Sequence, residues 1–381
     1  MKKFVKPKQF EANVIVIGAG SAGLVSSIIA SGAKKHTQAK VILIEKDKMG
    51  GDCLNTGCVP SKALIRSSRM ISDFRRADQF GIENFSGEIN FTKVMERVRA
   101  VIETIAPHDS VARYTSLGVE CIKGEAKIES PFLVSVDGRN ITTRSIILAT
   151  GASPLVPDIP GLQNIRYLTS DTVWGLSELP RRFLVIGGGP IGCEIAQAFA
   201  NLGSAVTQID SAPRIMARED SEVSSLLQDQ FTKDGISVLT NHKVVEFGRN
   251  EEQNYAILKN EEQTTRIEFD EVLIAVGRVA NTSGFGLENL DLPLTSNGNI
   301  AVNAALQTGY PNIFACGDVA GPHQFTHMAS YQAFFASLNA LLVGFWRVKA
   351  SDYIVPSATF TSPEIARAGL NEQQADSLEI D

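Results

Sequence analysis

The chain has 381 residues, 44% of them hydrophobic, with 31 glycines and a formal net charge of −6. A single hydrophobic core stops growing at roughly 250 to 300 residues, so we expect two or three domains. Basic residues are dispersed apart from the N-terminal MKKFVKPKQ, which argues against nucleic-acid binding. Five cysteines, an odd number with one plausible pair, favour a cytoplasmic protein over a secreted disulfide framework.

The first apolar stretch, VIVIGAGSAGLVSSIIASGA, follows basic residues and therefore mimics a signal peptide or a membrane helix. Its glycine pattern favours a strand over residues 13–17, a turn through Gly18, Gly20 and Gly23, and then a helix. The next strand, VILIE, ends at Glu45. In such units the glycines let the backbone approach a pyrophosphate, and the terminal acid accepts hydrogen bonds from a ribose. The pattern predicts a first dinucleotide site.

Two cysteines, Cys53 and Cys58, follow in the run GGDCLNTGCVPSKALI. Its two leading glycines permit close backbone approach or positive φ, and Pro60 suits the first turn of a helix. The apolar spacing after it predicts that helix, which places Cys58 at or near its N-terminus. Such a position favours the thiolate, the reactive form of cysteine.

The alternative for these two cysteines is a structural or metal-binding role. Zinc would need two further ligands at suitable spacing. The remaining cysteines stand singly in the sequence, at Cys121, Cys193 and Cys316. We therefore predict a redox-active pair and no resident metal site.

The second glycine fingerprint lies in RFLVIGGGPIGCEIAQAFANLGSAVTQID, with Gly187, Gly189 and Gly192 opening a helix and Asp210 ending the next strand. An acid at this point selects a free ribose 2′-hydroxyl, which favours NADH over NADPH. Arg214 lies close enough to leave the phosphorylated form open. Two fingerprints, each between a strand and a helix, predict two dinucleotide sites.

A later apolar stretch, Ala333 to Trp346, contains Ser337 and Asn339. It is shorter than the roughly 20 residues that a bilayer requires. We therefore expect a buried helix here and no membrane insertion.

Two dinucleotide sites and a dithiol suggest a relay from nicotinamide to flavin to sulfur. On these motifs nearly the whole chain resembles the FAD-dependent pyridine nucleotide disulfide oxidoreductases, the family of dihydrolipoyl dehydrogenase, glutathione reductase and mercuric reductase. The run CLNTGCVPSK is more similar to the dihydrolipoyl dehydrogenase and mercuric reductase branch. The resemblance implies FAD and NAD(P)H as cofactors, with NADH favoured.

The resemblance also implies roles for four catalytic residues. Cys58 matches the sulfur that faces the flavin, and Cys53 matches the outer sulfur that exchanges with substrate. Lys62 matches a lysine beside the flavin ring, and Glu194 matches its carboxylate partner near the nicotinamide pocket. A lysine there would stabilise the anionic reduced flavin. The alternative for this pair, less favoured even without the family, is a solvated surface ion pair.

Further cofactor contacts are implied by the start of the cysteine run, GGDC, and by three later segments. The motif ILATGASP resembles the return from the first FAD segment, IFACGDVAG the second FAD segment, and AVGRVANT the crossing back between domains. The residues assigned on this basis are Gly51, Asp52, Thr150, Gly151, Gly277, Arg278, Gly317 and Asp318. Asp52 departs from the family pattern, which more often has threonine there.

Among the five histidines, His327 in QFTHMAS is the tempting catalytic base. It aligns with a family segment whose backbone approaches the flavin at a helix start, so we expect no proton-transfer role. His323 is no better placed. We expect surface or strand-end positions for His36, His108 and His242.

After Ser351 the sequence resembles only the opening of the family's interface domain, too short for a domain of its own. In the family that domain forms the homodimer and carries a His and Glu dyad that reaches the partner's disulfide. In mercuric reductases it also carries a terminal cysteine pair. We expect either another contact over this segment or a shortened form of a longer enzyme, which leaves the homodimer open.

We thus predict an α/β chain with two Rossmann-like domains built on parallel sheets. An FAD domain (1–155 and 281–350) contains an inserted NAD(P) domain (156–280), and 351–381 begins a truncated dimerisation domain. Electrons should pass from NAD(P)H through FAD and the Cys53–Cys58 disulfide to a small disulfide, a lipoyl group or a thiophilic metal ion. The alternative is a truncated FAD- and NAD-binding diaphorase or redox-responsive binding protein.

Overall fold

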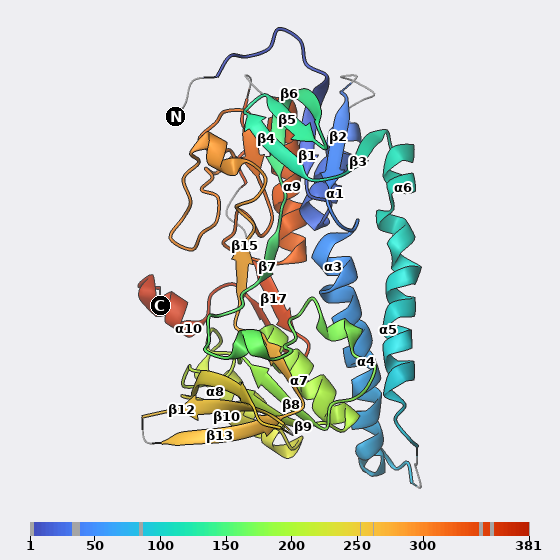
Figure 1. Ribbon diagram of the computed structural model, residues 1–381, viewed down its shortest axis with the longest axis vertical. Helices are drawn as coiled ribbons and strands as arrows, with labels where there is room; N and C mark the ends of the chain where they lie inside the picture. The colour runs from blue at the N-terminus through green and yellow to red at the C-terminus, as the bar shows by residue number, and fades with distance from the viewer. Residues whose placement is uncertain are drawn as a thin grey trace. The chain divides into compact units, whose positions relative to one another are not determined.

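The computed structural model describes residues 4–32, 39–83, 87–251, 253–261, 263–342, 346–350 and 354–380 (Figure 1). Two compact units make up the chain. Unit 1 comprises Met1–Asn55, Glu103–Ser153 and Val279–Tyr353, and unit 2 comprises Thr56–Ile102, Pro154–Arg278 and Ile354–Asp381. The domain boundaries expected near residues 155, 280 and 350 stay a prediction. The compact units group residues 56–102 with unit 2.

Unit 1 is built on a sheet whose central strands are parallel, in the order β3-β2-β1-β6, with β16 also pairing with β6. These strands are β1 (Ala12–Ile17), β2 (Val41–Glu45), β3 (Val119–Lys123), β6 (Arg139–Leu148) and β16 (Ile313–Ala315). The first part of β6 continues into an antiparallel meander with β5 (Leu133–Val136) and β4 (Ala126–Ser130). Strands β1 and β2 are almost wholly buried, as parallel strands covered on both faces must be.

Helices α1 (Ser21–Gly32) and α9 (Thr326–Leu341) share one hydrophobic cluster with one face of this sheet. The contact is rich in alanine, which lets the helices approach closely; α9 contributes Ala329, Ala333, Ala336 and Ala340. The prediction of a buried helix from Ala333 is thus confirmed as far as Leu341, while residues 343–345 lie outside the described part. A second cluster covers the opposite face with β4, β5 and η5 (Leu287–Leu290).

Unit 2 repeats the parallel arrangement in the order β10-β9-β8-β14. The strands are β8 (Arg182–Ile186), β9 (Ala205–Ile209), β10 (Ser237–Leu239) and β14 (Glu271–Ile274). An antiparallel sheet of β11 (Lys243–Arg249), β12 (Asn254–Lys259) and β13 (Thr264–Phe269) lies between β10 and β14 in the sequence. Two α/β units with parallel sheets confirm the predicted fold class.

Helices α4 (Cys58–Arg75) and α7 (Pro190–Leu202) pack against each other in unit 2, side by side in Figure 1. Leu64 and Phe199 are fully buried in their shared cluster. Polar contacts reinforce it, since Arg75 donates to the Asn201 carbonyl at 2.9 Å and Asn201 donates to Ser68 at 3.2 Å. This packing explains why α4 groups with unit 2 rather than with the segment before it.

The remaining elements are short or peripheral. The helices are α3 (Gly51–Asn55), α5 (Phe91–Ile105), α6 (Val111–Ser116), α8 (Ser221–Lys233) and α10 (Glu372–Ser377), and the 3-10 turns are η1 (Ala77–Phe80), η2 (Ala106–Asp109), η3 (Leu162–Asn164) and η4 (Val173–Gly175). The strands are β7 (Ala152–Pro154), β15 (Arg278–Ala280), and the hairpin of β17 (Pro356–Thr359) and β18 (Ile365–Ala368). Across the described ranges, no helix has the length and apolar character needed to cross a bilayer.

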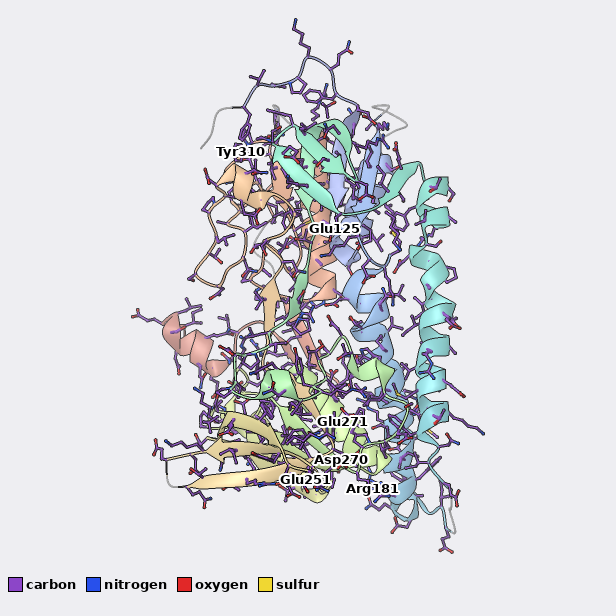
Figure 2. All side chains as sticks on the ribbon, viewed as in Figure 1. Glu125, Arg181, Glu251, Asp270, Glu271 and Tyr310 are labelled. Atoms are coloured by element: carbon purple, nitrogen blue, oxygen red, sulfur yellow. The ribbon has the colours of Figure 1, made fainter. Side chains whose placement is uncertain are left out.

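Two neighbouring acids at the start of β14, Asp270 and Glu271, are labelled in Figure 2 and have opposite environments. Asp270 accepts from the Arg182 guanidinium at 2.6 Å and from the Arg182 backbone N–H at 2.8 Å. Partial burial acts to raise its pKa, but the Arg182 hydrogen bonds and charge outweigh this and hold the pKa below its ordinary value. Burial raises the pKa of Glu271, whose nearest cation, Arg166, stands 3.8 Å away.

We predict that Asp270→Asn lowers the free energy of unfolding at pH 7 by about 1 kcal/mol, a figure already reduced for the solvent exposure of the pair. Because the folded-state pKa of Asp270 is lowered, its contribution is complete above the ordinary value of about 3.9 and is lost as pH falls through the folded value. Urea unfolding at pH 7 and pH 3 measures this. Glu271→Gln is the control and should lose no stability at pH 7, because its buried carboxylate is disfavoured. An equal loss in both variants would contradict the assignment.

Candidate functional site

The first fingerprint lies between β1 and α1, and two of its glycines are dictated by packing. Gly18 has φ +100°, and a Cβ there would stand 2.3 Å from the Ala149 carbonyl oxygen. A Cβ on Gly23 would stand 1.7 Å from the Gly18 oxygen. Gly20 differs, because the nearest described atom to its Cβ position is the Gly51 Cα at 3.9 Å. Its missing side chain leaves space at the N-terminus of α1.

Glu45 ends β2 beside this turn. Its carboxylate accepts the Ala19 N–H at 2.6 Å and the Asp47 N–H at 2.7 Å. The two hydrogen bonds hold the acid at the carboxyl edge of the sheet, next to the glycines. A carboxylate in this place can also accept from ribose hydroxyl groups.

The segment after β16 reaches the same edge of unit 1. Gly317 has φ +77°, and a Cβ there would stand 3.0 Å from the Ala22 Cβ of α1. The Gly317 N–H donates to Gln332 at 2.7 Å, and Gln332 donates to the Gly321 carbonyl at 2.9 Å. Half-buried Asp318 directly follows Gly317, so it lies beside the first fingerprint. Sequence reasoning missed Gln332, whose signal was a polar side chain on the buried face of a helix that also carries Ser337 and Asn339.

Helix α3 begins at Gly51, in contact with the first fingerprint. Gly51 has φ +54°, and a Cβ there would stand 2.6 Å from the Gly20 Cα, which confirms the expected close backbone approach. Asp52 is exposed in the first turn of α3, and Cys53 is half-buried one residue later. Unit 1 therefore brings together Gly18, Gly20, Gly23, Glu45, Gly51 and Gly317.

Cys58 is the first residue of α4, as predicted, and is half-buried. Pro60 falls in the first turn. Helix N-termini carry unpaired N–H groups and a positive dipole end, which favour a thiolate. Cys53 belongs to unit 1 and Cys58 to unit 2. Over the described parts of the chain, no three His, Cys, Asp or Glu residues are grouped so as to hold a metal ion.

The other cysteines lack this environment. Burial raises the pKa of the Cys193 and Cys316 thiols to about 12, and both are fully buried. Burial also raises the pKa of half-buried Cys121. Because the thiolate is the reactive form, these three thiols are poor redox partners at neutral pH.

The second fingerprint repeats the first between β8 and α7. Gly187 has φ +116°, and its Cβ would stand 2.3 Å from the Ala275 oxygen. A Cβ on Gly192 would stand 2.1 Å from the Gly187 oxygen. No described atom lies within 4 Å of the Cβ position of Gly189. The middle glycine again leaves open space at a helix N-terminus.

Asp210 is the counterpart of Glu45. Its carboxylate accepts the N–H groups of Gly188 and, at 2.7 Å, Ala212. Arg214, the residue that left NADPH open, donates to the backbone carbonyls of Ala217 at 3.3 Å and Glu219 at 3.2 Å.

Both turns fit a dinucleotide. In each unit an open middle glycine stands where a parallel strand meets a helix N-terminus, with a carboxylate fixed beside it. Those are the requirements for binding a pyrophosphate and a ribose. The fold therefore accommodates FAD and a nicotinamide dinucleotide, one on each fingerprint.

Local hydrogen bonds hold the two motifs ILATGASP and AVGRVANT, where the sequence predicts that the chain passes between domains. In unit 1, the Thr150 hydroxyl donates to the Asn281 carbonyl at 2.8 Å, and Gly151 accepts the Asn281 N–H at 3.0 Å. In unit 2, Gly277 has φ +144° and Arg278 donates to the Ser170 hydroxyl at 3.4 Å. Asn281 was missed in the sequence, although it sits inside the quoted motif.

Lys62 and Glu194 form an ion pair with an Nζ to Oε2 distance of 2.9 Å. Lys62 comes from the second turn of α4 and Glu194 from α7, so the packing of these helices brings them together. The Glu194 side chain is 7% exposed and that of Lys62 is 38% exposed. The other Glu194 oxygen accepts the Phe360 N–H at 2.8 Å. A buried carboxylate with two donors is not a solvated surface pair.

Two histidines, His327 and His242, have different surroundings. His327 is exposed in the first turn of α9 and stacks on Phe325, with ring centroids 5.3 Å apart. His242 is half-buried, with Nδ1 2.6 Å from the Thr240 carbonyl and Nε2 3.1 Å from Asn260. His36 lies outside the described residues.

The comparisons with known proteins agree with this geometry. The family model for pyridine nucleotide-disulphide oxidoreductases matches residues 12–333. The chain is 34% identical over 365 residues to a Staphylococcus aureus mercuric reductase, covering 95% of the chain and 65% of the relative. It is 37% identical over 372 residues to a Chlamydia pneumoniae dihydrolipoyl dehydrogenase, covering 96% and 77%. This chain thus spans less than two thirds of the first relative's length.

Solved structures give the same answer. The HOCl-induced flavoprotein disulfide reductase RclA from Escherichia coli superposes with a TM-score of 0.82 at 27% identity, over 96% of this chain and 79% of that one. A Cu(II) complex of RclA matches with the same TM-score. Together with the two glycine fingerprints, these matches show that the chain belongs to the pyridine nucleotide-disulphide oxidoreductases, a family of FAD-dependent oxidoreductases that use NAD(P)H.

Proposed function

We propose that this chain uses NADH and FAD to reduce a Cys53–Cys58 disulfide, which in turn reduces a small disulfide, a lipoyl group or a thiophilic metal ion. One observation carries the proposal. Cys58 opens α4, and the next turn of that helix holds Lys62, paired with Glu194 of the helix that the second fingerprint opens. The arrangement joins a reactive thiol position to a dinucleotide-binding helix.

The glycine turns and acids would hold the cofactors. Gly18, Gly20 and Gly23 with Glu45 bind one dinucleotide, and Gly187, Gly189 and Gly192 with Asp210 bind the other. Gly51, Asp52, Thr150, Gly151, Gly277, Arg278, Gly317 and Asp318 complete the proposed contacts. When bound, FAD supplies two-electron exchange between nicotinamide and sulfur.

The two electrons come through FAD, and the bond exchanges that follow take place on this chain's own sulfurs. Two electrons and a proton break the S–S bond between Cys53 and Cys58 and leave one thiolate, favoured at Cys58 by the N-terminus of α4. Cys53 then attacks the substrate disulfide and releases one substrate thiol. Attack by the Cys58 thiolate on the resulting mixed disulfide re-forms the Cys53–Cys58 bond and releases the second substrate sulfur as a thiolate, which takes a proton from solvent. Lys62 provides positive charge, and Glu194 holds its ammonium in place.

The preference for NADH rests on Asp210. Its carboxylate is held where a ribose 2′-hydroxyl would donate to it and where a 2′-phosphate would be repelled. Arg214 is engaged by two backbone carbonyls, which favours the same choice.

The acceptor is proposed from the relatives' names. Mercuric reductase acts on a thiophilic ion and dihydrolipoyl dehydrogenase on a dithiol, and both suit a pair of exchanging sulfurs. Cysteine usage favours a cytoplasmic setting, where glutathione and thioredoxin keep thiols reduced.

A diaphorase that reduces quinones or dyes without disulfide turnover is the second candidate, since it needs only the two dinucleotide turns. Steady-state assays with lipoamide, glutathione disulfide, mercuric ion and a quinone separate the two. Turnover of lipoamide, glutathione disulfide or mercuric ion, lost in Cys53→Ser, supports the disulfide reductase. Turnover of the quinone alone identifies the diaphorase.

We predict that anaerobic NADH makes two additional thiols alkylatable in the FAD-loaded protein, at Cys53 and Cys58, because only that pair is reduced. Peptide mass spectrometry after iodoacetamide treatment, with and without NADH, measures each site. Cys58→Ser should abolish the NADH-dependent change. Cys121→Ser is the matched control and should retain it. An NADH-dependent change at Cys121, or none at the pair, would remove the basis of the proposal.

We predict that Asp210→Asn raises the KM for NADH about tenfold and lowers the KM for NADPH, because it removes the charge that binds the 2′-hydroxyl of one and repels the 2′-phosphate of the other. Steady-state kinetics with both nucleotides measure the ratio. Asp229→Asn removes the same charge from an exposed position on α8 of unit 2 and should leave the ratio at the wild-type value. Equal effects on both nucleotides would argue against the role of Asp210.

A further inference from the structure

Three residues of unit 2 form a closed set of contacts: Lys62, Glu194 and Phe360. Lys62 donates to Glu194 Oε2 at 2.9 Å, and the Phe360 N–H donates to Glu194 Oε1 at 2.8 Å. The Lys62 Nζ also stands 4.6 Å from the centroid of the Phe360 ring. Phe360 therefore contacts both members of the ion pair, one through its backbone and one through its ring.

Each contact restricts a different degree of freedom. A carboxylate that accepts on both oxygens from different directions is fixed in its plane. Lysine carries its charge on a flexible four-carbon stem, so a single carboxylate leaves the ammonium free to swing. An aromatic face within about 6 Å attracts the ammonium and limits that movement. With its side chain 38% exposed, Lys62 has room to move without the ring.

Phe360 is itself held by the helices that carry the pair. Gln197, one turn after Glu194 on α7, accepts the Ser362 N–H at 2.7 Å and donates to the Ser362 carbonyl at 2.8 Å. Arg69 of α4 donates to the Phe360 carbonyl at 3.3 Å and the Thr361 carbonyl at 3.1 Å. The connection between β17 and β18 is thus fixed to α4 at Phe360 and Thr361 and to α7 at Ser362.

We propose that Phe360 is a positioning residue for the Lys62–Glu194 pair, with its N–H orienting Glu194 and its ring confining the Lys62 ammonium. The inference rests on the proposed function, in which the pair serves electron transfer. It extends that function by making the β17–β18 connection part of the same site.

The ring is tested with Phe360→Leu, which keeps the backbone N–H and an apolar side chain, and Phe360→Tyr, which restores the ring. In Phe360→Leu we expect acetylation of Lys62 by a succinimidyl ester to be about threefold to tenfold faster relative to Lys233, as the loss of one cation–π contact allows. The rate constant for reduction by NADH should fall by a similar factor with the KM for NADH unchanged. Phe360→Tyr should match wild type in both measurements.

Ile365→Val is the matched control, because it loosens the packing of β18 without touching the pair. It should leave the acetylation ratio and the rate constant at wild-type values. The backbone contact is tested by hydrogen exchange, and Glu194→Ala should speed exchange of the Phe360 amide about tenfold or more by removing its acceptor.

The proposal is overturned if Phe360→Leu behaves as wild type, if Phe360→Tyr behaves as Phe360→Leu, or if Ile365→Val reproduces the effect. Lys62 acetylation and Phe360 amide exchange do not require catalysis. If wild-type protein is not reduced by NADH, the proposed function fails, while these two measurements still decide the role of Phe360.

Discussion

A turn of three glycines, placed where a parallel strand meets a helix N-terminus, is the constraint on which both units depend. Gly18 and Gly187 both have positive φ, and a Cβ at either position would also stand 2.3 Å from a backbone carbonyl oxygen, that of Ala149 or Ala275, so no other residue fits there. The helix N–H groups then face the open space above the middle glycine. This geometry attracts a negatively charged pyrophosphate without any basic side chain.

The same turn fixes the acids for which we propose sugar recognition. Glu45 and Asp210 each accept two backbone N–H groups. One belongs to the residue after the first glycine of the turn, and the other belongs to the residue two positions after the acid itself. The strand, the glycine turn and the acid are therefore held together by the same contacts in unit 1 and in unit 2. The repetition shows that this is a property of the fold and not of one ligand.

The redox residues depend on a second constraint, the packing of α4 on α7. It sets Lys62 against Glu194, and it leaves Cys58 at the helix start, where a thiolate is favoured. Full burial of Cys193 and Cys316 raises their pKa to about 12 and keeps them as thiols. Environment thus separates one reactive thiol position from inert thiols of the same chain.

By itself the sequence determined the two fingerprints, the terminal acids, the start of α4 at Cys58 and the α/β class, because each follows from local periodicity and from glycine conformation. Only the tertiary structure decided which distant residues meet. Gln332 reaches Gly317 from α9, and Phe360 reaches Glu194 and Lys62 from the β17–β18 connection. Sequence spacing does not encode such contacts, since they depend on how helices far apart in the chain pack against each other. The grouping of α4 with unit 2 has the same cause.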